Sequence, residues 1–268
     1  MRRALAGLAF ALALVAADAR ADISAPPALA GVGVSTAPLA QLPLDVPLVD
    51  QDGGRVTLGS YFDGTRPVIL LIAYYHCPML CPLDHMGVLH ALQHSTWKPG
   101  RDLRLVSVSI DPHEGPADAR RMRDEVAKVD TIGAADAWSF TTADPPAIRR
   151  LTDALAYRYR YVAAQDQYAH PAAAFAVTAD GRVAKVIQAV DLESSELDGA
   201  LAQAASGSAG SSLQTVLLQC FCYTPSLRRY AGFIAGMIKF GGALIFIATA
   251  LVFLLGRMRR PDWERESS

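Results

Sequence analysis

The sequence predicts an α/β domain in which a central sheet is flanked by helices, followed by one C-terminal transmembrane helix. A continuous apolar run at residues 67–75 is typical of a strand buried on both faces of a sheet. Two cysteines, Cys77 and Cys81, stand where this run ends and a helical pattern begins. The segments that follow alternate as strand, helix, strand, helix, hairpin and helix. With a cysteine pair at the first strand-to-helix turn, this order predicts a thioredoxin-like fold over residues 45–205.

Composition limits the classes of function that the chain can have. Its 268 residues are 51% hydrophobic, which is enough to bury a core of good size. The formal net charge is -1, and the sequence shows no concentrated basic face. Binding to nucleic acid needs a strongly basic face, so we expect no nucleic-acid partner.

The first 21 residues have the pattern of a secretory signal peptide. Arg2 and Arg3 form a positive start, residues 4–17 are apolar, and small residues precede a cleavage site before Asp22. We therefore expect the body of the chain to be exported. Cysteines of exported proteins usually form disulfides. Here three residues separate Cys77 from Cys81 and one residue separates Cys220 from Cys222, and neither spacing gives the long loop that a structural disulfide usually closes.

A second apolar segment, residues 231–256, is long enough to cross a bilayer and is predicted to be a transmembrane helix. Arg257, Arg259 and Arg260 follow it directly, so the positive-inside rule places the tail 257–268 in the cytoplasm. An exported N-terminus followed by one span leaves a single topology. We expect a single-pass protein of the bacterial inner membrane, with its folded domain on the periplasmic side.

The rest of the chain is taken in order. Residues 22–44 contain four prolines and no periodicity, which predicts an extended lead-in. Residues 44–61 alternate around Asp52-Gly53-Gly54, as in a β-hairpin. Residues 206–230 form a Gly/Ser linker and a juxtamembrane segment. Further strands are predicted at 103–110, 138–141, 157–162, 175–178 and 183–188, and helices from Pro116 to about 129, at 145–156 and at 192–205.

The turn that carries the two cysteines ends in a helix. We expect this helix to begin at Pro82, because proline is tolerated at the first helical position but lacks the N–H needed further inside. Cys81 would then be the N-cap. Thiolates near a helix N-terminus are favoured over thiols, and two soft thiolates select soft ions, above all Cu(I). Metal binding, which needs a third ligand, and thiol exchange both remain open on the residues alone.

Six histidines are available as the third ligand: His76, His85, His90, His94, His113 and His170. His170 lies in the loop before the strand at 175–178, which a thioredoxin-like fold places across from the cysteine turn. His113 lies in the loop after a neighbouring strand, and His85 lies within the helix. His90 and His94 are one helical turn apart, which suits a solvated helix face better than a metal clamp.

The run 67–92, with Tyr74-Tyr75-His76-Cys77-Pro78-Met79-Leu80-Cys81, resembles the Sco/SenC family of copper chaperones. The resemblance extends to Ser109-Ile110-Asp111-Pro112 and to the His170 loop with the Asp180-Gly181 hairpin. It also includes Phe221-Cys222-Tyr223-Thr224-Pro225 before the membrane segment. In all it covers residues 31–256 and fits the branch of the family with a C-terminal anchor.

The resemblance implies a site and a partner. Cys77 and Cys81 would be copper-binding thiolates and His170 the third ligand, for Cu(I), Cu(II) or both. The partner would be the dinuclear copper centre in subunit II of a haem-copper oxidase, with another periplasmic copper carrier or a thiol reductant as further partners. One departure is Ala169, where the family often has an acidic residue.

Other functions fit the same cysteines. The main alternative is a periplasmic thiol-disulfide oxidoreductase in which Cys77 and Cys81 reduce the oxidase cysteines before metallation. A peroxiredoxin-like peroxidase is a third. The Cys-x-x-x-Cys spacing favours metal, because a regular disulfide needs close Cβ atoms. For Cys220 and Cys222 we expect a packing role together with a disulfide or an unreactive thiol. The alternative is a second thiolate pair that holds or relays copper near the membrane.

Overall fold

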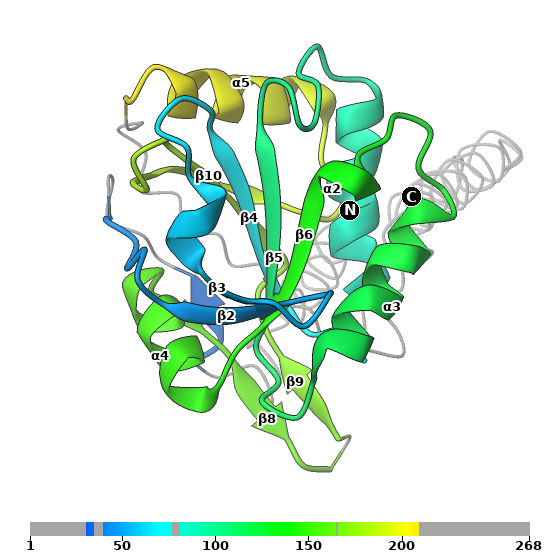
Figure 1. Ribbon diagram of the computed structural model, residues 1–268, viewed down its shortest axis with the longest axis vertical. Coiled ribbons are helices and arrows are strands. Elements are labelled where there is room, and N and C mark those ends of the chain that lie inside the picture. The colour runs from blue at the N-terminus through cyan, green and yellow to red at the C-terminus, as the bar shows by residue number, and fades with distance from the viewer. Residues whose placement is uncertain (1–30, 35–39, 77–80, 165, 209–268) are drawn as a thin grey trace, which may run out of the picture. The chain divides into compact units, whose positions relative to one another are not determined.

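The computed structural model describes residues 31–34, 40–76, 81–164 and 166–208 (Figure 1). The predicted signal peptide and transmembrane segment lie outside these residues, as do Cys77, Cys220 and Cys222. Cys81 lies at the start of a helix whose backbone is described. No helix within the described ranges is long and apolar enough to cross a membrane.

The main feature is a seven-stranded sheet with the order β11-β10-β4-β5-β6-β2-β3. Its strands are β2 (Pro47–Asp50), β3 (Arg55–Thr57), β4 (Val68–Ala73), β5 (Arg104–Ser109), β6 (Trp138–Thr142), β10 (Ala173–Val177) and β11 (Val183–Gln188). β4, β5 and β6 run parallel to one another. The other neighbours pair antiparallel, including β10 with β4. The strand that precedes the cysteine turn therefore lies at the centre of the sheet.

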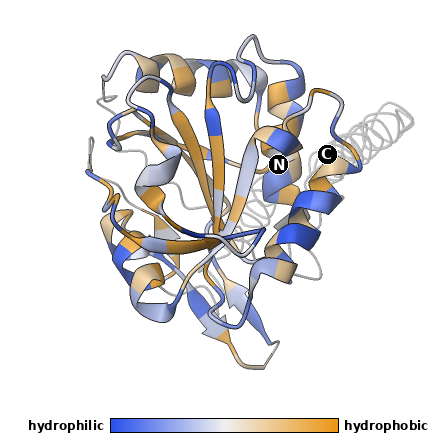
Figure 2. Ribbon diagram, in the orientation of Figure 1, coloured by the Kyte–Doolittle hydropathy of each residue, from blue (hydrophilic) through white to orange (hydrophobic). Residues whose placement is uncertain are grey.

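Burial explains why β4 takes that central place. All six of its residues are buried, with exposed fractions of 1% or less. An apolar strand without alternation has no face that suits water, so it needs cover on both sides of the sheet. Figure 2 shows the hydrophobic colours gathered on the central strands. Burial of such side chains is the main favourable contribution to folding.

Four helices are described: α2 (Cys81–Gln93), α3 (Pro116–Ala127), α4 (Pro145–Ala154) and α5 (Ser194–Ala205). α2 contacts β4 and also packs against both α3 and α5, whereas α4 packs against β7 (Tyr157–Arg158). Two 3-10 turns, η2 (Leu58–Tyr61) and η3 (Ala135–Ala137), complete the helical segments. Gly87 allows α2 to approach the chain after β11, because a Cβ there would overlap the carbonyl oxygen of Ala189.

The predicted mixed α/β architecture with a central sheet and flanking helices is confirmed. The hairpin at 44–61 forms as β2 and β3, and the one around Asp180-Gly181 forms as β10 and β11. The described part of α2 begins at Cys81, so Cys81 is itself helical and is not the N-cap that the sequence predicted.

The predicted edge strand at 157–162 is wrong in one respect, because it divides into two short strands. β7 pairs with β1 (Gly33–Val34), and β8 (Arg160–Val162) pairs with β9 (Gln167–Ala169), which the sequence did not indicate. Each pair is a separate two-stranded sheet. The packed core also begins before residue 45, since Leu42 and Val34 are each only 2% exposed.

Candidate metal centre

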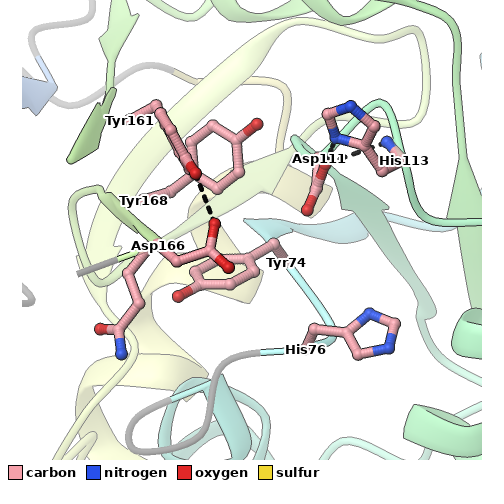
Figure 3. Close-up of a pocket in the computed structure, with 8 residues that line it drawn as sticks. Tyr74, His76, Asp111, His113, Tyr161, Asp166 and Tyr168 are labelled. Carbon is pink, nitrogen blue, oxygen red and sulfur yellow. Dashed lines mark hydrogen bonds and ion pairs between the residues drawn. The ribbon is translucent and has the colours of Figure 1, made fainter. Parts of the chain in front are cut away.

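A cavity of about 800 Å³ lies where β4 ends (Figure 3). It is bounded by the end of β4, by the loop between β5 and α3, and by the β8–β9 hairpin. Its lining residues are Tyr74, His76, Asp111, His113, Tyr161, Asp166, Gln167 and Tyr168. His76 immediately precedes Cys77, so this cavity opens beside the predicted cysteine turn.

His170 is buried next to the end of β4. The residue is only 1% exposed, and its ring contacts the ring of Tyr74 edge-on at a centroid distance of 5.8 Å. In the antiparallel pairing of β10 with β4, Ala174 lies opposite Leu71. Continued backwards along β10, that register brings residue 170 level with residue 75. The structure thus places His170 across from the strand end that leads into the cysteine turn.

The Nδ1 atom of His170 is held by two oxygen atoms. It lies 3.0 Å from the hydroxyl of Tyr157 and 3.1 Å from the carbonyl oxygen of Pro171. The single proton of the Tyr157 hydroxyl is shared with two carbonyl acceptors, Ile72 O at 3.0 Å and Pro171 O at 2.8 Å. The Tyr157 hydroxyl and the Pro171 carbonyl both accept from Nδ1, so they favour the tautomer with the proton on Nδ1 and the ring lone pair on Nε2.

The remaining histidines have different surroundings. His85 is fully buried, donates to or accepts from Ser107 Oγ at 3.0 Å through Nε2, and stacks on Phe140 at 5.4 Å. It is therefore a core residue. His113 is 87% exposed and contacts Asp111 Oδ1 at 2.9 Å through Nδ1. His113 lines the cavity, whereas His170 is the buried histidine at the end of β4.

The backbone before the cysteines is tied to Glu114, which sequence reasoning missed. The Glu114 carboxylate accepts hydrogen bonds from the backbone N–H of Tyr75 at 2.7 Å and of His76 at 2.6 Å. It also accepts from Ser109 Oγ at 2.5 Å and contacts His76 Nδ1 at 3.0 Å. Burial raises the pKa of this carboxyl, while the hydrogen bonds from Ser109, Tyr75 and His76 act against that rise.

Tyrosine rings form most of one cavity wall. Tyr168 lies between Tyr74, at a ring distance of 5.4 Å, and Tyr161, at 5.3 Å. Burial and the nearby Asp111 carboxylate raise the pKa of Tyr168 to about 12. Figure 3 shows the Tyr161 hydroxyl bonded to Asp166 across the end of the β8–β9 hairpin. The wall is therefore aromatic and carries hydroxyl groups that stay protonated at neutral pH.

Ala169, the departure from the family pattern, is fully buried. It packs with Val32 and Val162 in a small cluster separate from the main core. These aliphatic neighbours suit alanine, whereas a carboxylate at this position would be buried without a polar partner among them, which is energetically costly.

The predicted ligands are only partly within the described residues. Cys77 lies outside them, and Cys81 begins α2. The structure describes no cluster of three or more histidine, cysteine or acidic side chains suited to a metal ion. The ligand set Cys77, Cys81 and His170 stays a prediction, with only His170 placed by its side chain.

One sequence comparison identifies a family, and the comparisons with solved structures identify a shared fold. The sequence model of the SCO1/SenC family matches residues 40–205. A candidate electron transfer protein from Aquifex aeolicus VF5 is 23% identical with a TM-score of 0.55, and the match covers 67% of this chain and 96% of that one. A SCO1/SenC family lipoprotein from Bacillus anthracis str. Ames is 14% identical with a TM-score of 0.53, covering 63% and 97%. These two structures show that the fold is shared.

The copper-bound ScoI of Arabidopsis thaliana is 18% identical with a TM-score of 0.49, and the match covers 64% of this chain and 97% of that one. No curated protein matches the chain.

Proposed function

The chain belongs to the SCO1/SenC family, since the family match spans more than half of its length, and we propose from this that it is a copper chaperone. Membership supports a role in copper handling and in cytochrome c oxidase assembly. We further propose that its target is the dinuclear copper centre in subunit II of a haem-copper oxidase. Copper is then the cargo, bound for a time and passed on.

The proposed ligands are the thiolates of Cys77 and Cys81 and the Nε2 atom of His170. The observation that carries this proposal is the position of His170, buried at the end of β4 with its Nδ1 atom held by Tyr157 and Pro171. A histidine fixed in this way presents one nitrogen in one direction, which is how proteins hold a metal ligand ready. Two thiolates and one imidazole suit copper better than harder ions.

The cavity beside the site supports transfer to a protein partner. Copper bound by three protein ligands must be reached by the ligands of the acceptor, so one side of the site has to be open. The cavity of about 800 Å³ is lined by Tyr74 and His76 from the strand end and by the half-exposed Tyr161. An acceptor loop entering there would approach the strand end directly before Cys77.

We propose that the protein works at the periplasmic face of the bacterial inner membrane. The signal peptide at 1–21, the transmembrane segment at 231–256 and the cytoplasmic tail at 257–268 are the sequence features that support this location. Such a tether would keep the domain near the membrane-bound oxidase. Alkaline phosphatase fused after residue 268 should be inactive, and active enzyme would contradict the topology.

The ligand set is tested by copper titration of the full-length protein in detergent. Cys77→Ser and Cys81→Ser should each remove the thiolate-to-Cu(II) charge-transfer absorption and weaken Cu(I) binding. His170→Ala should weaken binding of Cu(II) in particular, because imidazole suits that ion. His90→Ala, an exposed histidine on α2, is the control and should behave as the wild type. Undiminished affinity in both cysteine variants would contradict the copper proposal.

The second candidate is a thiol-disulfide oxidoreductase that reduces the oxidase cysteines before metallation. It is favoured by one observation: Cys81 is the first described residue of α2, the helix that follows the central strand β4, and thiolates are stabilised at helix N-termini. This function predicts rapid disulfide exchange with a dithiol peptide in the absence of metal. Slow exchange together with tight copper binding would favour the chaperone.

A further inference from the structure

Glu114 is a buried carboxylate with a dense set of donors at the edge of the proposed site. Its side chain is 1% exposed. Both carboxylate oxygens lie within 2.8 Å of the backbone nitrogen of Tyr75, and Oε1 lies 2.6 Å from that of His76. Ser109 Oγ, at the end of β5, holds Oε2 at 2.5 Å. One side chain thus joins the end of β5 to the two residues directly before Cys77.

The bonds from Glu114 take the place of the sheet hydrogen bonds that Tyr75 and His76 lack beyond the end of β4. β4 ends at Ala73, and its parallel pairing with β5 ends at Ser109, so residues 75 and 76 have left the regular ladder. Backbone N–H groups in a buried place need acceptors, and an ionised carboxylate is a strong one. Glu114 therefore fixes the direction in which the chain leaves the sheet.

The contact with the His76 ring is the weaker part of the arrangement. The His76 side chain is 53% exposed, and it contacts both Glu114 Oε1 at 3.0 Å and Asp118 Oδ1 at 3.3 Å. Solvent screens such ion pairs, so they contribute little. The bonds to the backbone are buried at Tyr75 and partly buried at His76, and they are the ones that restrain the chain.

We propose that Glu114 is a positioning residue that fixes the backbone of Tyr75 and His76, the two residues directly before Cys77. The inference rests on the proposed function, because it treats Cys77 as a working thiol. Glu114 acts through the chain, as outer groups that orient metal ligands do in other sites. The β5–α3 loop, which also lines the cavity through Asp111 and His113, restrains the chain before Cys77 through this side chain.

The test compares Glu114→Gln with two controls in the full-length protein. Glutamine keeps the size but loses the charge and one acceptor oxygen, and its amide N–H₂ would face donors. Glu125→Gln makes the same change on α3 at an exposed residue paired with Lys128. Val126→Ala removes buried volume from α3 and so reports the effect of lower stability alone. Ser109→Ala is a milder change that removes one donor to Glu114 and serves as the test variant if Glu114→Gln fails to fold. It should shift copper affinity and the thiol–disulfide equilibrium in the same direction as Glu114→Gln.

Two readouts separate positioning from general stability. Copper affinity should fall by about 10- to 100-fold in Glu114→Gln, the range found for groups that orient ligands. The second readout is the equilibrium of the Cys77–Cys81 disulfide with glutathione, measured without metal. It should shift roughly tenfold toward the dithiol, which is a rise of about 30 mV in the reduction potential of the pair. A looser chain brings the two thiols together less often, which gives the direction of this shift.

Both controls should leave both readouts near the wild-type values. Equal values in Glu114→Gln and Glu125→Gln, or an equal shift in Val126→Ala, would overturn the inference. Absence of copper binding by the wild type would overturn the proposed function instead, and the metal-free equilibrium would still decide the role of Glu114.

Discussion

Replacing Tyr157 by phenylalanine removes a single oxygen atom from the support of His170. Tyr157 is 3% exposed, and its hydroxyl lies 3.0 Å from His170 Nδ1, 3.0 Å from Ile72 O and 2.8 Å from Pro171 O. The ring remains and still packs on Phe175, at a centroid distance of 6.2 Å. Tyr157→Phe therefore changes hydrogen bonding with little change in packing.

The expected effects have two magnitudes. The free energy of unfolding should fall by about 1 to 3 kcal/mol, since buried polar groups lose a partner. Copper affinity should fall by about 10- to 100-fold, because loss of a group that orients a metal ligand has this cost. The second effect corresponds to about 1.4 to 2.8 kcal/mol of binding free energy.

Stability is measured by urea unfolding, and copper affinity by competition with a colorimetric Cu(I) chelator. Tyr161→Phe is the matched control, because it removes the same atom from a half-exposed residue on the cavity wall. Its effect on stability should stay within about 0.5 kcal/mol. If Tyr157→Phe lowers stability but binds copper as tightly as Tyr161→Phe, the hydroxyl does not orient a metal ligand and the argument for His170 fails.

Three further predictions concern the surroundings of the site. Ala169→Asp should lower the free energy of unfolding by about 3 kcal/mol or more, because the carboxylate would be buried against Val32; an unchanged urea midpoint would contradict this. His85→Ala should cost about 2 to 4 kcal/mol through lost packing while copper affinity stays within about twofold, and a large loss of affinity in a chelator assay would make His85 a ligand candidate. Tyr168, with a pKa of about 12 in the folded state against 10.0 for ordinary tyrosine, binds its proton more tightly when folded. Stability should therefore fall as pH rises from about 10 to about 12, and Tyr168→Phe should reduce that loss in alkaline urea titrations.

Local patterns predicted the elements that depend on local physics. The run 67–75 forms β4 because its residues have no polar face, and Pro116 and Pro145 open helices because a fixed φ and a missing N–H suit a first turn. The hairpin around Asp52-Gly53-Gly54 forms because Gly53 adopts a positive φ of 87°. These requirements are met within a few residues, so they can be recognised in sequence.

The short strands could not be predicted in this way. β8 and β9 have three residues each, which is too few for an alternating pattern to emerge. The chain leaves α4 through Ala156 at a positive φ of 45°, a backbone conformation that alanine rarely adopts. Tertiary contacts impose this turn, and the predicted strand at 157–162 is divided by the pairing of β7 with β1.

By itself the sequence predicted the class of fold and the central strand that ends just before Cys77, and the resemblance to the Sco/SenC family singled out His170 among six histidines. Only the tertiary structure showed what holds that histidine and the strand end. Tyr157 and Glu114 act through bonds to residues 13 and 39 positions away, and nothing near them in sequence marks such a role. Hydrogen bonds between distant segments depend on how the chain packs, so their partners are decided when the sheet assembles.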